Sequence, residues 1–206
     1  LHGRPAASLF GDRARLWRDF RNMALLAAAL GAVGLLLLAT IADVRWEKSL
    51  TSWALLLPLA LPLILLQTGA EEMVFRGYLL QQLGARFGAG ALSAWMVAPS
   101  LLFVAGHLDP GGQGGNLPVI AGVIFLFALI SADITARTGS LGAAWGLHFV
   151  NNVLAILFVT LEGPLSGLSL GGLPFAASSS AALPWLLLDG LGLTLVYLLW
   201  RWRYGR

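Results

Sequence analysis

Residues 71–76 read EEMVFR, and they place two carboxylates and a guanidinium in an otherwise apolar part of the chain. The preceding run, 53–66, is almost wholly hydrocarbon apart from Pro58 and Pro62, and the next four residues are Gly77-Tyr78-Leu79-Leu80. An ionisable side chain inside a membrane segment is energetically expensive. Three such side chains within six positions therefore indicate a functional site.

The spacing of these charges predicts different surroundings for the two glutamates. On a helix, residues four apart share a face, so Glu72 and Arg76 should form a pair in the favourable order. Glu71 lies about 100° round the helix from Glu72, and one turn before it stands only the neutral Gln67. Acid/base sites push paired titratable groups into unlike environments, so this asymmetry is typical of such a site.

Composition places the chain among membrane proteins. Of its 206 residues, 58% are hydrophobic and only 11% are charged, whereas a soluble domain carries about 25% charged residues. The chain has no Cys, which excludes disulfides, a thiolate nucleophile and a Cys-based metal site. The arginines cluster at span ends rather than along one long face, so nucleic acid is not an expected partner. We predict an all-α, polytopic transmembrane helical bundle with about six spans.

The predicted spans follow from runs of about 20 apolar residues, the length that crosses the hydrocarbon of a bilayer. They are 23–41, 53–83, 91–107, 117–136, 141–161 and 183–200. The second is too long to cross once without tilting or kinking. The first exceeds the apolar core of a signal peptide, so we interpret it as a retained anchor.

The domain prediction is an N-terminal arm, 1–22, followed by one transmembrane domain, 23–206, with its motifs within 53–158. We expect the Gly/Ser/Pro-rich stretch 162–182 to be a loop.

The placement of Lys and Arg predicts the orientation. Arginines occur in the N-terminal arm, at Arg86, at Arg137 and in the C-terminal tail, whereas the alternate loops 108–116 and 162–182 contain no Lys or Arg. Positive charge favours the cytoplasmic side. We expect an integral, multi-pass protein of the bacterial inner (plasma) membrane with both termini cytoplasmic.

Further polar side chains fall within the predicted spans. His107 comes late in the third, and His148 and Asn152 share a face of the fifth. At about 1.5 Å per residue, these groups and the glutamates lie roughly 13–24 Å along their segments, so they could meet in one cavity. Asp133 and Arg137, again four apart, are better interpreted as an interfacial pair.

Gly142 and Gly146 form a small-residue stripe roughly opposite His148, and this stripe predicts close helix packing.

Three motifs follow one another on separate spans: Glu71-Glu72-x-x-x-Arg76, Phe103-x-x-x-His107 and His148-x-x-x-Asn152. In this order they resemble the CPBP family of intramembrane glutamic endopeptidases, which includes CAAX prenyl proteases of the Rce1 type and bacterial proteins linked to bacteriocin processing or self-immunity. The flanking segments 75–80 and 138–141 fit as well.

The resemblance implies an endopeptidase that uses water to hydrolyse a peptide bond of a membrane-associated peptide or protein. We expect no cofactor or metal, because the chain has no Cys and no zinc-type His pair. Glu71 would be the general base, and His107 would help to hold the water. His148 and Asn152 would stabilise the oxyanion, since imidazole and amide N–H groups are suitable donors where water is scarce. A carboxylate in an apolar cavity is also a stronger base than one in water.

Glu72 and Arg76 would support and orient this site, although the two could also form a purely structural ion pair. Likewise, a lone His or Asn in a span often serves as interhelical glue. Three other functions remain open: a zinc-dependent intramembrane protease, since Glu and His can bind zinc; a non-catalytic membrane or immunity protein; and a proton-coupled transporter. No His-Glu-x-x-His occurs to favour the zinc enzyme.

Overall fold

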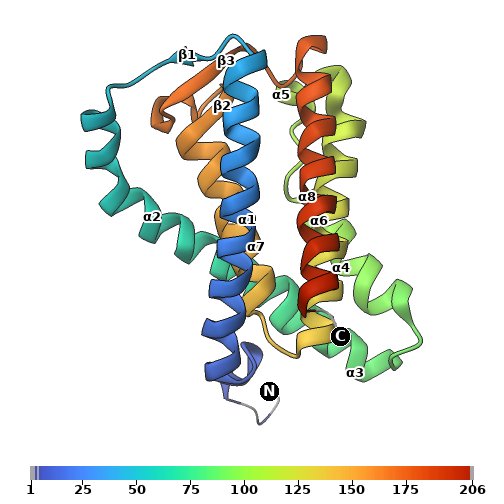
Figure 1. Ribbon diagram of the computed structural model, residues 1–206. Coiled ribbons are helices and arrows are strands. Elements are labelled where there is room, and N and C mark those ends of the chain that lie inside the picture. Colours follow the sequence, from blue (N-terminus) through green and yellow to red (C-terminus); the bar gives the residue numbers. More distant parts are fainter. Residues whose placement is uncertain (1–2, 4, 205–206) are drawn as a thin grey trace.

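Long apolar helices dominate the computed structural model, which describes residues 3 and 5–204 (Figure 1). Residues 1–2 and 4 of the predicted N-terminal arm and residues 205–206 of the predicted C-terminal tail lie outside the described residues. The helices are α1 (Arg13–Ile41), α2 (Leu50–Glu72), α3 (Leu80–Phe87), α4 (Ala98–Ala105), α5 (Pro110–Gln113), α6 (Leu117–Thr138), α7 (Gly142–Val153) and α8 (Leu183–Tyr204).

Three π-helical segments extend these helices: Met73–Leu79, Ser93–Val97 and Leu154–Phe158. The first joins α2 to α3 in one helical stretch, Leu50–Phe87. Short 3₁₀ turns span Ala6–Leu9, Gly114–Asn116, Ser166–Leu168 and Ser180–Ala182.

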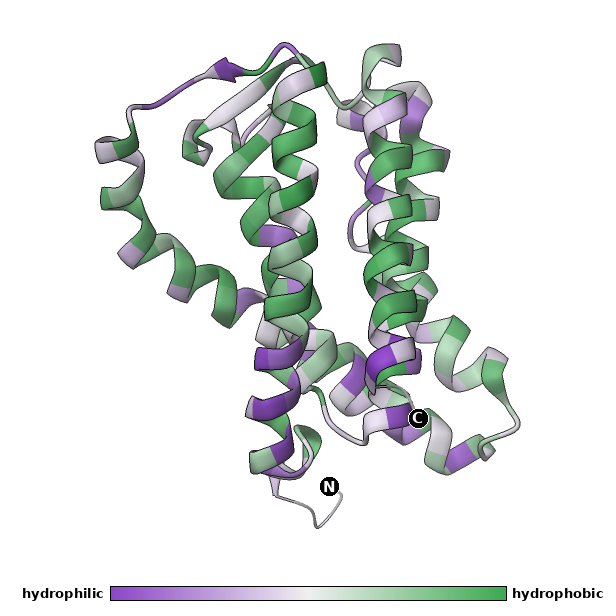
Figure 2. Ribbon diagram, in the orientation of Figure 1, coloured by the Kyte–Doolittle hydropathy of each residue, from purple (hydrophilic) through white to green (hydrophobic). Residues whose placement is uncertain are grey.

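Four of these helical stretches are long and apolar enough to cross a membrane, namely Arg13–Ile41, Leu50–Phe87, Pro110–Thr138 and Ser180–Tyr204. Two shorter apolar helices, Ser93–Ala105 and Gly142–Phe158, accompany them. Figure 2 shows hydrophobic residues over the central lengths of α1, α6 and α8, with hydrophilic residues toward the end where α1 begins and α8 finishes. The prediction of an all-α, polytopic membrane bundle is confirmed.

Several predicted boundaries differ from the structure, among them the start of the first span and the end of the fifth. The first helix begins at Arg13 rather than Met23, because the side chain of Asp12 accepts a hydrogen bond from the Arg15 backbone N–H at 2.9 Å and caps the helix. The helix predicted over 141–161 ends at Phe158, where the backbone turns extended at Val159.

A small sheet occupies part of the stretch predicted as a loop. Its strands are β1 (Arg45–Trp46), β2 (Val159–Glu162) and β3 (Gly171–Ala176), in the order β1-β3-β2. β3 pairs antiparallel with β1 and parallel with β2. The sheet lies at the end of the bundle away from the start of α1 (Figure 1). The loop prediction for 162–182 is therefore wrong over β3.

Helix α7 is central, because it packs against α1, α2 and α6. A Cβ atom at Gly142 would meet the carbonyl oxygen of Leu16, and one at Gly146 would meet that of Phe20. Both glycines thus allow the backbones of α1 and α7 to approach, as the stripe predicted. The opposite face of α7 is left to carry His148.

Candidate active site

The two glutamates are the last residues of α2, immediately before the π-helical segment Met73–Leu79. Such segments are frequent at functional sites. The preceding turn of α2 is fixed against α7 by Trp145, whose indole N–H donates to the Leu65 carbonyl at 3.1 Å and lies 3.2 Å from the Thr68 hydroxyl. The indole packs on Gly69, where a Cβ would come within 2.9 Å of the ring. This contact positions the end of α2 relative to α7.

Glu72 and Arg76 form the predicted pair, and they are deeply buried. Their relative exposures are 0% and 2%, and Arg76 Nη1 lies 3.0 Å from Glu72 Oε1. Arg76 Nη2 also donates to the Ala128 carbonyl of α6 at 3.3 Å, and the guanidinium lies 4.6 Å from the ring centroid of Phe103. The charge of Glu72 is therefore matched by a fixed cation that is itself hydrogen-bonded.

His148 joins this pair from α7. Its Nδ1 lies 2.8 Å from Glu72 Oε1. A carboxylate accepts, so Nδ1–H is the donor. This bond turns the other ring nitrogen, Nε2, toward Glu71, whose Oε2 is 3.7 Å away. His148 is buried, so its ring orientation is fixed by packing as well as by the bond.

His107 approaches the same glutamate oxygen from another side. Its Nδ1 lies 2.7 Å from the carbonyl oxygen of Phe103, to which it donates, and its Nε2 lies 3.7 Å from Glu71 Oε2. The sequence placed His107 inside the third span, but α4 ends at Ala105 and the histidine occupies the following turn. The ring is 37% exposed at this position, so this side of the cluster is the open one.

Asn152 reaches the site through a residue that the sequence prediction did not include. Its Nδ2 donates to Gln67 Oε1 at 3.2 Å, and the Gln67 amide in turn donates to Glu71 Oε1. Gln67 therefore links α7 to the first glutamate. The available signal was its position one turn before Glu71, which puts an amide on the same helical face.

The six predicted residues thus lie in one connected cluster, with Gln67 as an added member. Within the described part of the chain, Glu71 Oε2 and Glu72 Oε2 are buried and have no hydrogen-bond partner. Two imidazole nitrogens flank the oxygen of Glu71, each too far for a direct hydrogen bond and close enough for a bridging water. No group of three His, Asp or Glu side chains among the described residues is arranged to hold a metal ion.

The second predicted ion pair, Asp133 with Arg137, lies apart from the glutamate cluster. Arg137 Nε is 2.6 Å from Asp133 Oδ2, and the Tyr197 hydroxyl donates to the same oxygen at 2.7 Å. Arg201 Nη1 is 3.6 Å away. These contacts tie the end of α6 to α8 and do not include any residue of the glutamate cluster.

Comparison with known proteins agrees with the motifs. The family model for type II CAAX prenyl endopeptidase Rce1-like proteins matches residues 52–154, half of the chain. The chain is also 34% identical over 113 residues to the uncharacterized protein YyaK of Bacillus subtilis (strain 168), an alignment that covers 54% of this chain and 37% of that protein. The chain thus spans well under half of the length of this curated relative. No solved structure matches the chain. The matched region contains all six predicted residues, and the chain belongs to the Rce1-like family of type II CAAX prenyl endopeptidases.

Proposed function

We propose that the protein is an intramembrane endopeptidase in which Glu71 activates water to hydrolyse a peptide bond of a membrane-associated substrate. The observation that carries this proposal is the position of Glu71 Oε2. It is buried, has no hydrogen-bond partner among the described residues, and lies 3.7 Å from Nε2 of both His107 and His148. A carboxylate oxygen with unused acceptor capacity beside two imidazoles is suited to bind and deprotonate water.

His107 is placed to hold that water. Because its Nδ1–H donates to the Phe103 carbonyl, Nε2 of the neutral ring carries a lone pair and accepts a hydrogen bond. A water between Glu71 and His107 can donate one hydrogen bond to each acceptor. The lone pair of its oxygen is then free to attack a carbonyl carbon.

His148 is suited to stabilise the oxyanion. To donate from Nε2 it must carry protons on both ring nitrogens, and the Glu72 carboxylate against Nδ1 supplies the counter-charge for that state. Asn152 uses one amide N–H for Gln67, and its second N–H can donate to the oxyanion of the tetrahedral intermediate. Removal of one oxyanion donor typically lowers the rate about 10²–10³-fold.

The proton balance closes within the cluster. Water forms the new C–O bond as its proton passes to Glu71, and the carbonyl oxygen becomes the oxyanion. When the tetrahedral intermediate collapses, the C–N bond breaks and Glu71 returns the proton to the departing amine. Glu72 and Arg76 do not touch the reacting atoms in this scheme; they position His148.

Comparison of cleaved peptides tests the proposal. Membranes containing wild-type protein should yield cleaved membrane-proximal peptides, identified by mass spectrometry, that are absent with Glu71→Gln. The purified protein should cleave the same peptides in detergent and in the presence of a strong chelator. Cleavage that the chelator stops and zinc restores would identify a zinc protease. Proton-coupled transport in sealed vesicles without any peptide product would identify a transporter. If the protein shows neither cleavage nor transport, it is a non-catalytic membrane protein.

We also propose that both termini face the cytoplasm of a bacterial inner membrane. Three segments that carry arginines lie at one end of the bundle (Figure 1): helix α3, the start of α1 and the end of α8. This clustering is what the positive-inside rule requires. Reporter fusions after Arg86 and Arg137 should be cytoplasmic, and fusions within Gly111–Gly115 should be external. A cytoplasmic signal from the glycine loop would overturn this orientation.

A further inference from the structure

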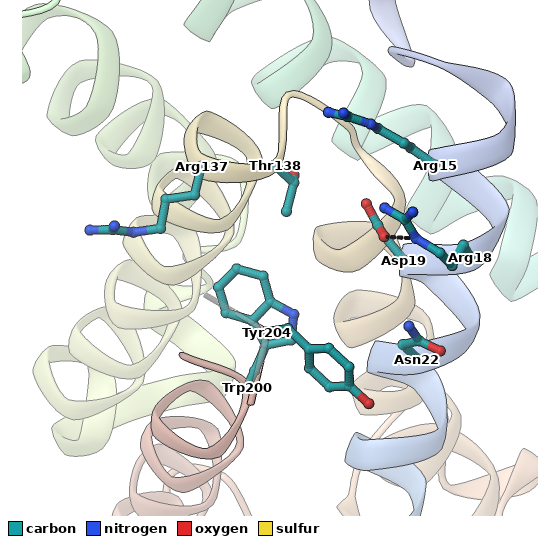
Figure 3. Close-up of a pocket in the computed structure, with 8 residues that line it drawn as sticks. All are labelled: Arg15, Arg18, Asp19, Asn22, Arg137, Thr138, Trp200 and Tyr204. Atoms are coloured by element: carbon teal, nitrogen blue, oxygen red, sulfur yellow. Dashed lines mark hydrogen bonds and ion pairs between the residues drawn. The ribbon is translucent and has the colours of Figure 1, made fainter. Parts of the chain in front are cut away.

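A second polar cavity lies apart from the glutamate cluster. Its volume is about 310 Å³, and its walls come from the first turns of α1, the last turn of α6 and the last turns of α8 (Figure 3). A cavity of this size lies within the range of about 300–1,000 Å³ typical of ligand sites. The proposed reaction uses none of its residues.

Positive charge predominates in the lining. Three arginines, Arg15, Arg18 and Arg137, stand against one lining carboxylate, Asp19; because Asp133 outside the lining pairs with Arg137, the surplus is one positive charge. Arg18 Nε is 3.0 Å from Asp19 Oδ1, and Arg137 is held by Asp133 on α6. The guanidinium of Arg15 has neither an ion pair nor a hydrogen bond within the described part of the chain, and in Figure 3 it extends from α1 toward the segment that carries Thr138.

The remaining polar atoms are mainly hydrogen-bond donors. Asn22 offers an amide, Trp200 an indole N–H and Tyr204 a hydroxyl. Within the described residues, none of these three side chains has a hydrogen-bond partner. In Figure 3 the two aromatic rings lie across the pocket from the two α1 arginines. Guanidinium and N–H donors around one space match the oxygen atoms of a phosphate group.

The position of the pocket favours a lipid as the source of that phosphate. α1 and α8 are membrane-length helices, and Trp and Tyr near helix ends lie at headgroup level in membranes. Leu25, one turn after Asn22 on α1, is 64% exposed, and an apolar cavity lined by Leu30 of α1 and Val196 of α8 lies further along the same two helices, so apolar surface is present where acyl chains would lie. Basic pockets between transmembrane helices on the cytoplasmic side bind anionic headgroups.

We propose that this pocket binds the phosphate of an anionic phospholipid, with Arg15 and Arg18 as its principal contacts. Phosphatidylglycerol, whose headgroup carries a phosphate anion and no cation, is the matching probe. The bound lipid would join the start of α1 to the end of α8.

Lipid retention by the purified full-length protein tests this proposal. Native mass spectrometry and thermal melting would compare added phosphatidylglycerol with phosphatidylcholine at equal mole fraction. Wild-type protein should retain phosphatidylglycerol preferentially and melt higher with it. Each arginine near an anionic surface contributes about a fivefold change in affinity, so Arg15→Gln with Arg18→Gln should weaken the preference roughly 25-fold.

Two single variants provide matched controls. Asp19→Asn removes the one negative charge of the pocket and should increase retention of phosphatidylglycerol, a gain that misfolding cannot produce. Arg86→Gln removes an arginine of α3, a helix outside the pocket and near the same end of the bundle (Figure 1), and should leave the preference unchanged.

Several results would overturn the proposal. An equal loss with Arg86→Gln would indicate a general charge effect. If inorganic phosphate or glycerol phosphate stabilises the protein as strongly as the lipid does, the pocket is a site for soluble anions. If a peptide with a free C-terminal carboxylate displaces the lipid through the same two arginines, the pocket recognises peptide termini. No preference in the wild type would refute the site itself.

Discussion

Glu72→Gln tests whether the buried ion pair of the cluster is structural support or the reacting group. The substitution keeps the shape of the side chain and removes its charge. Glu72 is 0% exposed and accepts from both Arg76 at 3.0 Å and His148 at 2.8 Å through one oxygen. In the variant the guanidinium keeps only the Ala128 carbonyl at 3.3 Å, a neutral amide oxygen and the nearby aromatic rings.

The expected loss of stability is large. Breaking a buried pair by removing one charge costs about 3–5 kcal/mol. For a chain of this size each kcal/mol lowers Tm by about 2–4 °C, so Glu72→Gln should melt about 6–20 °C below wild type. Its cleavage rate should fall as well, because His148 loses its orientation.

Glu71→Gln should behave differently. The Glu71 side chain is 27% exposed, and a glutamine there can still accept from Gln67. We expect a Tm close to wild type and a rate lower by about 10²–10⁴-fold or more, since the base is removed. Melting in detergent and peptide cleavage, measured on both variants, would separate the two effects.

The matched control is Glu162→Gln, the same chemical change at an exposed carboxylate in β2, which should alter neither quantity. Adding Arg76→Met to Glu72→Gln should recover part of the lost stability, because no unpaired charge remains. The reasoning is refuted if Glu72→Gln melts with wild type. A stable, inactive Glu72→Gln beside an active Glu71→Gln would exchange the roles of the two glutamates.

Three further substitutions test other parts of the structure. Gln67→Leu removes a hydrogen bond to the Glu71 carboxylate that is worth about 1.5–3 kcal/mol. We therefore expect kcat to fall about 10–100-fold with little change in KM. A change confined to KM would contradict a positioning role for Gln67. Gly146→Val should lower stability by about 1–3 kcal/mol because its Cβ meets the α1 backbone, whereas Gly122→Ala, which meets nothing within 4 Å, should not; melting in detergent distinguishes them. Asp189 lines an apolar cavity of about 530 Å³ between α1, α7 and α8, and its carboxylate has no ion pair or hydrogen bond within the described residues. Asp189→Leu should therefore raise Tm in detergent. A lower Tm would show that the carboxylate makes a favourable contact.

Features that depend on residue spacing within a single helix could be predicted from the sequence. The six predicted apolar runs correspond to the four long and two shorter apolar helical stretches, and spacings of four predicted the Glu72–Arg76 and Asp133–Arg137 pairs. The Gly142–Gly146 stripe predicted close helix packing, and the structure shows that the partner is α1. These features are local, because each follows from the geometry of a single helix.

Features that depend on distant segments were missed. β1 has two residues and β3 contains Gly171, Gly172 and Pro174, so neither shows the alternating pattern of a strand. Their pairing joins residues that are far apart in sequence. The role of Gln67 likewise becomes visible only when Asn152 on α7 is placed beside it. His107 was assigned to a span because the apolar run was followed past Gly106, although a glycine at that position, the C-cap of α4, is a local signal for a helix end.

The two imidazoles approach Glu71 from different parts of the bundle, and this gives the proposed reaction a handedness. His107 follows α4, and His148 is carried by α7, while both Nε2 atoms lie at 3.7 Å from the same oxygen. With water held on the His107 side and the carbonyl oxygen on the His148 side, only one prochiral face of the peptide group meets the nucleophile. A substrate running in the reverse direction exchanges the amide nitrogen and the Cα atom and would present the other face, so in the proposed reaction the cluster would select chain direction.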